Sequence, residues 1–391
     1  MAEILNIEKR PTALLVRVGG LGDIIVLTAV AKVLNKKGYD VDFFCGSPTG
    51  EVFKLIENLY YFRKVVPVNR VNGVDCIKDG DNYVALELLK KDYDEVFDFK
   101  FSIENNVAGV NIREGWRGSL NSNFMNWVDL SLSWCKVDWT KIPDNDKRPE
   151  IELSAEVEYT EWLKTLPFDI DGSTRNHKVI GIQLQASSLI RSWYRAQDLP
   201  EIIYKKYPQD VILIFTGAEW VIISKNGKER IVFPENLNPL MCSAWLVSLM
   251  NVFISADSGM SHIAEAVGTK CITIYTTVPA WTREQYYKYS YPIEAQCSCT
   301  PCFTLDVFCP LERKSAESSL TPVEKDIIDC QKKGTNITEV ASKYQTVPRA
   351  IEDQFQAASK KLEALSAKMP LCVASITPEI IIDKLIEVLE Q

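Results

Sequence analysis

The chain has 391 residues, of which 46% are apolar and 25% are charged, enough to build more than one hydrophobic core. Its net charge of −8 at pH 7 argues against a general electrostatic attraction to nucleic acid or anionic lipid. No apolar run approaches the length of a membrane span, and the N-terminal Met-Ala-Glu-Ile-Leu lacks the basic region of a signal peptide.

The first part of the chain alternates between apolar strand patterns and amphipathic helix patterns. Strands are predicted at 13–18, 41–45, 64–68 and 94–98, and helices at 24–37, 50–58 and 82–90. Such alternation is typical of a parallel sheet with helices on both faces. The stretch 99–150 is less regular and rich in Asn, Trp and Ser, so we expect loops there.

A second alternating series follows a predicted helix at 152–164 and a polar linker at 169–176. Its predicted strands and helices are 179–184, 196–206, 211–216, 243–250, 252–256, 260–267 and 271–275. The sequence therefore predicts two α/β domains. Ligands of such open sheets bind beyond the carboxyl ends of the strands.

A glycine-rich turn joins the first strand to the first helix. Gly19-Gly20-Leu21-Gly22-Asp23 follows the strand 13–18 and precedes the apolar helix. The spacing is not a dinucleotide fingerprint, and Asp23 would repel a pyrophosphate. A carboxylate at this point suits a general base beside a cleft, with an ordinary helix N-cap as the alternative.

A second turn has a similar setting. Asp257-Ser258-Gly259-Met260-Ser261-His262 lies between the apolar strand 252–256 and a short helix. The first N–H groups of such a helix point outward from a positive dipole end and suit a phosphate or diphosphate. The alternative is a helix start that is simply capped by Asp257 or Ser258.

Together these turns resemble the heptosyltransferase family of glycosyltransferases (family 9), which uses ADP-heptose. The resemblance rests on Arg17-x-x-x-Leu21-Gly22-Asp23, on Asp257-Ser258-Gly259-x-x-His262, on Gln183–Ser188 with Arg191 and Trp193, and on Ile212–Glu219. The chain departs from the family at Ala29, Arg191, Tyr194 and Thr276-Thr277, where proline, lysine, proline and Gly-Pro are usual. Arginine can still hold a phosphate.

The resemblance implies a GT-B fold, in which two Rossmann-like domains face a cleft. It divides the chain into an acceptor domain (1–170), a nucleotide-sugar domain (177–295), a Cys-rich helical insertion (296–374) and a C-terminal helix packing back on the domains (375–391). It also implies an inverting glycosyltransferase without a catalytic metal, which moves a heptose-like sugar from a nucleotide-diphosphate donor to an acceptor hydroxyl.

The resemblance also assigns roles to individual residues. Asp23 is the expected catalytic base, and Arg17 and Gly22 belong to the acceptor side or its loop. The expected donor-binding residues are Ser187, Ser188, Arg191, Gly217, Glu219, Asp257, Ser258, Gly259 and His262. The helix start and Arg191 would meet the charge of the leaving diphosphate.

Other functions remain open on the sequence. The same two-domain frame serves sugar-nucleotide epimerases, although Asp23 with the second turn favours a transferase. The missing proline and glycine positions also fit a catalytically idle sugar-nucleotide binder or assembly scaffold. The acceptor is a protein, a lipopolysaccharide or, in a phage-type transferase, a modified nucleobase.

The insertion is rich in cysteine, and five of the chain's eleven cysteines lie between residues 297 and 330. Cys299, Cys302, Cys309 and Cys330, with Cys297 as a substitute, could form a structural zinc or iron site. Similar cysteine fingers occur in autotransporter heptosyltransferases of the family; free thiols or a redox pair are the alternatives. The insertion also offers a surface for homo-oligomers. Cysteines within apolar strand segments elsewhere in the chain, such as Cys45 and Cys271, favour a cytoplasmic protein with reduced thiols.

Overall fold

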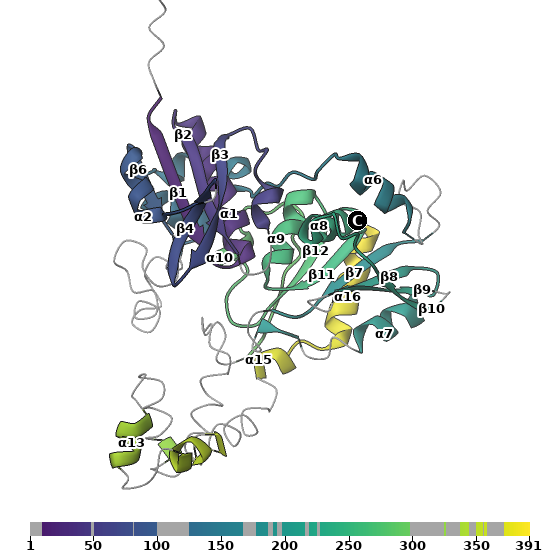
Figure 1. The fold of residues 1–391 in the computed structure, drawn as a ribbon. Coiled ribbons are helices and arrows are strands. Elements are labelled where there is room, and N and C mark those ends of the chain that lie inside the picture. Colours follow the sequence, from purple (N-terminus) through teal and green to yellow (C-terminus); the bar gives the residue numbers. More distant parts are fainter. Residues whose placement is uncertain are drawn as a thin grey trace, which may run out of the picture.

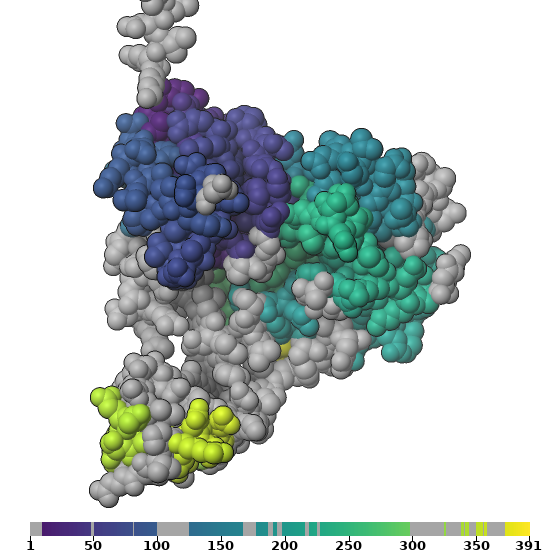
Figure 2. Space-filling view, in the orientation of Figure 1, coloured from purple at the N-terminus to yellow at the C-terminus, as the bar shows by residue number. Residues whose placement is uncertain are grey.

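The structure is a computed structural model of the chain. It describes residues 10–47, 51–80, 82–99, 125–166, 177–186, 191–193, 198–215, 219–224, 227–297, 324–325, 337–343, 349–354, 356–357 and 371–391. Two α/β domains lie side by side, with the early strands in one and the later strands in the other (Figure 1). The space-filling view shows them in contact (Figure 2). The predicted fold class is thereby confirmed for the described residues.

The first domain is built on one sheet with the strand order β5-β4-β3-β2-β1-β6. Its four parallel strands are β1 (Thr12–Val18), β2 (Asp40–Gly46), β3 (Phe62–Val71) and β6 (Glu95–Asp98). Strands β4 (Val74–Asp79) and β5 (Asn82–Ala85) add antiparallel pairs at one edge. The parallel strands agree with the sequence prediction because each is a buried apolar run.

The antiparallel edge replaces a predicted helix. The sequence prediction of a helix at 82–90 was wrong over residues 82–85, which form β5, and only α2 (Leu86–Leu89) and the short η2 (Lys90–Asp92) follow. Residues 82–85 pair with β4 instead, after a turn in which Gly80 has positive φ, and β4 itself follows a turn in which Asn72 and Gly73 both have positive φ. Asn-Gly is the preferred pair for a two-residue hairpin turn. The predicted helix at 50–58 is likewise only a 3-10 turn, η1 (Val52–Leu55).

The second sheet has the order β10-β9-β8-β7-β11-β12-β13. Its parallel strands are β7 (Val179–Gln183), β8 (Val211–Phe215), β11 (Val252–Ala256), β12 (Cys271–Tyr275) and β13 (Ile293–Glu294). Strands β9 (Trp220–Ser224) and β10 (Gly227–Ile231) form an antiparallel hairpin at the edge, which the sequence analysis did not predict.

Helices cover both sheets. The second domain carries α7 (Leu199–Lys206), α8 (Pro239–Ser248), α9 (Gly259–Val267), α10 (Trp281–Glu284), α15 (Leu371–Ala374) and α16 (Pro378–Glu390). Between the sheets the chain forms α5 (Trp127–Trp134), η4 (Trp139–Lys141), η5 (Asp144–Lys147) and α6 (Val157–Lys164). In the insertion, α13 covers Ile337–Lys343. None of the helices among the described residues combines the length and hydrophobicity that a bilayer crossing needs.

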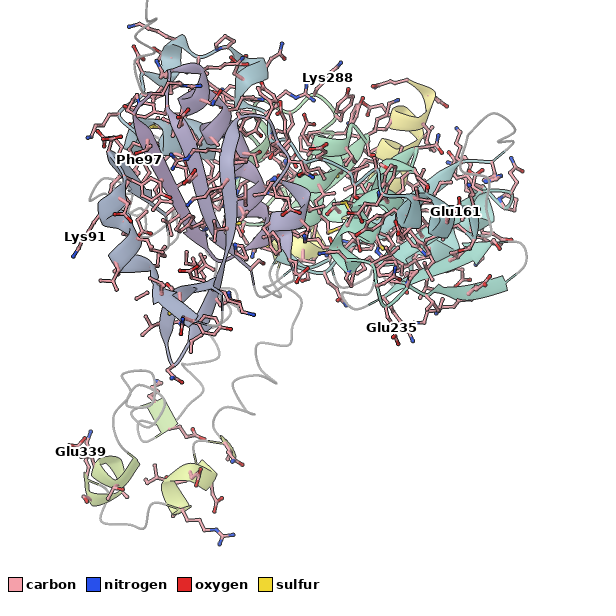
Figure 3. The ribbon with its side chains drawn as sticks, turned by 45° about the horizontal axis from the view of Figure 1, so that its top comes forward. Lys91, Phe97, Glu161, Glu235, Lys288 and Glu339 are labelled. Atoms are coloured by element: carbon pink, nitrogen blue, oxygen red, sulfur yellow. The ribbon has the colours of Figure 1, made fainter. Side chains whose placement is uncertain are left out.

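The domains are joined through α1 (Leu21–Lys36), which is buried along most of its length between the first sheet, α5 and α9. A helix that is apolar all round is expected in such an enclosed position. One cluster of buried apolar side chains runs from α1 and the first sheet into α8 and α9. A second cluster lies between the second sheet, α7 and α16. Exposed charges such as Lys91, Glu161 and Glu235 lie outside these cores, whereas Phe97 is buried (Figure 3).

Candidate active site

The two glycine turns that stand out in the sequence lie against each other at the domain boundary. Gly22 begins α1 and His262 lies in the first turn of α9, and a Cβ added to Gly22 would come within 2.5 Å of His262 Cδ2. A Cβ added to Gly259 would come within 2.8 Å of Leu21 Cγ. Only glycine allows the two helix starts to approach this closely. The structure therefore brings both predicted motifs into one site.

Asp23 lies in the first turn of α1 and is partly exposed. Its Oδ2 accepts a hydrogen bond from Nη2 of Arg17, a side chain that is only 4% exposed at the end of β1. Nη1 of the same guanidinium donates to the carbonyl oxygen of Phe99 at 2.5 Å. Arg17 thus holds the orientation of the Asp23 carboxylate from the side of the first sheet. A buried arginine held in this way is a rigid support.

His262 is buried at the contact between the helices. Its Nδ1 lies 2.6 Å from the hydroxyl oxygen of Tyr287, and the two rings meet edge to face. Burial lowers the pKa of His262 to about 4, partly opposed by Asp257. The imidazole is therefore neutral at pH 7, with one ring N–H and one acceptor nitrogen.

Asp257 directly follows β11 and is buried beside Arg191. Nη1 of Arg191 lies 3.3 Å from the main-chain oxygen of Asp257 and 3.5 Å from its Oδ2. Two residues of the predicted donor site are therefore paired, although they are 66 positions apart in the chain. The guanidinium supplies positive charge at the carboxyl edge of the second sheet, where ligands of open sheets bind.

Ser258 is the residue before α9, with an extended backbone and no side-chain cap on the helix. Its hydroxyl instead donates to Oε1 of Gln183 at 2.9 Å, and Ser255 donates to the same oxygen at 3.2 Å. The side chain of Gln183 thus connects the ends of β7 and β11. Because Ser258 leaves the helix start uncapped, the first N–H groups of α9 remain suited to an anion.

The remaining predicted site residues are less closely connected to this group. Glu219 forms an ion pair with Arg230 at 2.6 Å across the β9–β10 hairpin. Ser187, Ser188, Gly217 and all four predicted metal-binding cysteines, Cys299, Cys302, Cys309 and Cys330, lie outside the described residues. Cys297 is described and partly buried. Within the part of the chain that the structure describes, no group of three metal-binding side chains occurs.

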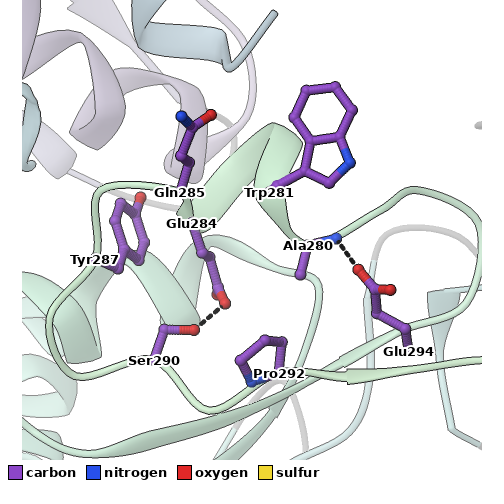
Figure 4. A pocket seen from close by; sticks show the side chains of 8 residues that line it. All are labelled: Ala280, Trp281, Glu284, Gln285, Tyr287, Ser290, Pro292 and Glu294. Carbon is purple, nitrogen blue, oxygen red and sulfur yellow. Dashed lines mark hydrogen bonds between the residues drawn. The ribbon is translucent and has the colours of Figure 1, made fainter. Parts of the chain in front are cut away.

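A pocket of about 530 Å³ adjoins this site. It is lined from α10 and the chain between α10 and β13, by Trp281, Glu284, Gln285, Tyr287, Ser290 and Glu294 among others (Figure 4). Burial raises the pKa of Glu284 to about 7, opposed by hydrogen bonds from Ser290 and Thr273. Tyr287 and Glu284 were not identified in the sequence because no motif surrounds them.

Comparison with known proteins supports the sequence motifs. Residues 236–308, which contain β11, α9 and β12, match the family model of glycosyltransferase family 9 (heptosyltransferase). The resemblance to family 9 is confirmed. The matched segment holds four residues of the predicted donor site, Asp257, Ser258, Gly259 and His262. No curated protein matches the chain in sequence.

One solved structure shares the fold, and two further ones are similar to a lesser degree. A family 9 glycosyl transferase from Veillonella parvula superposes with a TM-score of 0.53 at 12% identity, over 97% of each chain. ADP-heptose LPS heptosyltransferase II of E. coli has a TM-score of 0.48 at 14% identity, over 73% of this chain and 91% of its own. The iron-containing dodecameric glycosyltransferase TibC of enterotoxigenic E. coli has a TM-score of 0.45 at 13% identity, over 75% of this chain and 65% of its own. The likeness in fold rests on the first of these.

Proposed function

We propose that the chain is an inverting glycosyltransferase that transfers a heptose-like sugar from a nucleotide-diphosphate donor to an acceptor hydroxyl. The observation that carries the proposal is the contact of Gly22 with His262, because it joins the predicted base to the family 9 segment. An idle binding protein would not need a carboxylate held by a buried arginine at this contact. Asp23 and Arg17 therefore favour an enzyme over a scaffold.

In the proposed reaction, Asp23 accepts the proton of the acceptor hydroxyl. The acceptor oxygen attacks the anomeric carbon from the face opposite the leaving group, and the bond from this carbon to the diphosphate oxygen breaks. The electron pair leaves with the nucleoside diphosphate, and the configuration of the anomeric carbon inverts. Arg17 is a positioning residue, since it would act through its hydrogen bond to the Asp23 carboxylate.

The donor diphosphate is proposed to lie at the start of α9. The N–H groups of this helix, the hydroxyl of Ser258 and the guanidinium of Arg191 provide donors and positive charge for the leaving group. If Tyr287 donates to Nδ1 of His262, the ring proton is on Nε2, which faces the Gly22 turn and is available to donate. Ser187, Ser188, Gly217 and Glu219 complete the proposed donor site.

Asp23→Asn and Arg191→Met test the two halves of this proposal separately. Loss of a general base lowers kcat by about 10²-fold or more, while nucleotide binding by calorimetry stays unchanged. Arg191→Met weakens nucleotide-diphosphate binding by about tenfold or more, because a charged hydrogen bond is lost. The exposed Asp92→Asn serves as a matched control. Near-normal turnover of Asp23→Asn would remove Asp23 as the base, and a complete lack of nucleotide binding would favour the scaffold.

We also propose that Cys299, Cys302, Cys309 and Cys330 hold one structural zinc or iron ion, on the strength of their spacing. Four thiolates would fill a tetrahedral site, so the proposed catalysis does not use this metal. The insertion is also the proposed surface for homo-oligomers. Five buried cysteines, Cys45, Cys76, Cys135, Cys242 and Cys271, are free thiols, in keeping with the proposed cytoplasmic location.

A further inference from the structure

The pocket beside α10 is a separate cavity, with one wall in common with the candidate active site. Tyr287 lines the pocket and places its hydroxyl 2.6 Å from Nδ1 of His262. On the other side, the main-chain oxygen of Trp281 accepts a hydrogen bond from the Asn126 side chain at 3.0 Å. Asn126 comes from the chain between the two sheets, next to the predicted loops. The pocket therefore lies where both domains meet.

The charges on the pocket wall are all negative. Glu284 and Glu294 are the charged side chains among its lining residues, and no lysine or arginine belongs to that lining (Figure 4). Oε1 of Glu294 accepts a hydrogen bond from the main-chain N–H of Ala280 at 2.6 Å, which fixes its place at the rim. A nucleotide diphosphate would be repelled here, because like charges are brought together in a partly desolvated cavity.

Glu284 is a buried acid, 6% exposed. It accepts hydrogen bonds from hydroxyl groups, from Thr273 at 2.8 Å and from Ser290, rather than from a lysine or arginine of the described residues. Buried carboxylates are normally paired with a cation, because burial of an unpaired charge is costly. Burial raises the pKa of Glu284 to about 7, so the acid is only partly ionised at neutral pH. A positively charged ligand in the adjoining cavity would favour the ionised form and supply the positive charge that the two hydroxyl donors lack.

Two aromatic side chains contribute to the same wall. Trp281, at 39% exposure, and Tyr287 both line the pocket. The faces of tryptophan and tyrosine attract ammonium and guanidinium groups, and the attraction grows when water is excluded. Two aromatic side chains together with two carboxylates form a lining that suits a cation better than an anionic ligand.

We propose that this pocket binds a positively charged group, a primary ammonium or a guanidinium, with Glu284 and Glu294 as its counter-charges. The pocket adjoins Tyr287 and His262, so the cation belongs to the acceptor and places its hydroxyl near the active site. This second step rests on the proposed transferase function. The first step, cation binding, does not.

Calorimetry with n-butylammonium chloride and N-methylguanidinium chloride tests the first step directly, with n-butanol and methyl glucoside as uncharged probes. The cations are expected to bind and the uncharged probes are not. Glu284→Gln keeps the size of the side chain and is expected to weaken cation binding by about tenfold or more. Glu294→Gln is expected to weaken cation binding as well. Glu161→Gln on exposed α6 is the matched control and leaves binding unchanged.

Each result decides the proposal. Binding of methyl glucoside in place of the cations, or equal cation binding by Glu284→Gln and the unaltered protein, would overturn it. Nucleotide binding and circular dichroism show whether Glu284→Gln is folded; if it is not, the cation affinity of Glu294→Gln decides instead. Lysine- or arginine-containing peptides and glucosamine then distinguish a polypeptide from an amino sugar as the source. Cation binding without sugar transfer would support the pocket and count against the transferase.

Discussion

Replacing Gly22 with alanine tests whether the two glycine turns are packed as closely as the structure shows. The added Cβ would lie 2.5 Å from Cδ2 and 3.0 Å from Nε2 of His262, and 3.3 Å from Cα of Gly259. The imidazole has little freedom to move, because it is buried and bonded to Tyr287. Overpacking of this kind costs about 1–3 kcal/mol.

The helix itself favours the substitution, because alanine in place of glycine stabilises a helix by about 1 kcal/mol. The net loss in unfolding free energy is therefore expected to be at most about 2 kcal/mol. Urea unfolding followed by circular dichroism measures it, and nucleotide binding reports on the site. Gly20→Ala is the matched control, because its Cβ meets no ring or main-chain atom and only the end of the Asp23 side chain, with Oδ2 at 3.1 Å. If Gly22→Ala proves more stable than the unaltered protein, as the helix preference alone would make it, the close packing of α1 on α9 is wrong.

Three further predictions concern titration and metal content. The folded-state pKa of His262, about 4, lies below its ordinary value of 6.5, so His262 contributes about 3 kcal/mol to the free energy of unfolding above pH 6.5, and this contribution is lost as the pH falls through 4. NMR of the chain's two histidines should show one signal titrating near pH 4. Titration of both near 6.5 would refute the burial of His262. The pKa of Glu284 is shifted in the opposite direction, from 4.5 to about 7, so the unaltered protein loses stability as the pH rises through this range. In urea unfolding, Glu284→Gln should therefore gain up to about 3 kcal/mol relative to the unaltered protein between pH 4.5 and 7. A stability difference between the two proteins that does not change with pH would contradict this. Elemental analysis should find about one zinc or iron per chain, lost in Cys302→Ser, whereas a metal-free chain would leave the cysteines as free thiols or a redox pair.

The parts of the fold that the sequence predicted well are those with strong local patterns. The strands β11 and β12 have the predicted bounds, because each is a five-residue apolar run between turn residues. The β3–β4 hairpin was missed even though Asn72-Gly73 is the usual signal for its turn. Strand β5 was missed because the short run at 82–90 fits the helical period of 3.6 residues as well as the strand period of two.

In the candidate site, too, some residues could be predicted from local sequence patterns and others could not. Asp23, Asp257 and His262 follow strand ends, and the carboxyl edges of parallel sheets are where such residues gather. The close approach of Gly22 to His262 joins positions 240 residues apart, which no local pattern encodes. Tyr287 and Glu284 follow β12 in a segment without a motif, so their burial and bonding partners required the structure.

The insertion begins and ends at nearly the same point, because the main-chain N–H of Gln296 donates to Oγ of Ser375 at 3.1 Å. Beyond that point, Ile376 accepts a hydrogen bond from the Trp193 indole, and α16 closes the apolar cluster beneath the second sheet. During synthesis, the second domain must therefore wait for about eighty residues of inserted chain before its last helix emerges from the ribosome. The same geometry makes this junction a place where a short linker could replace the insertion without stretching the domain.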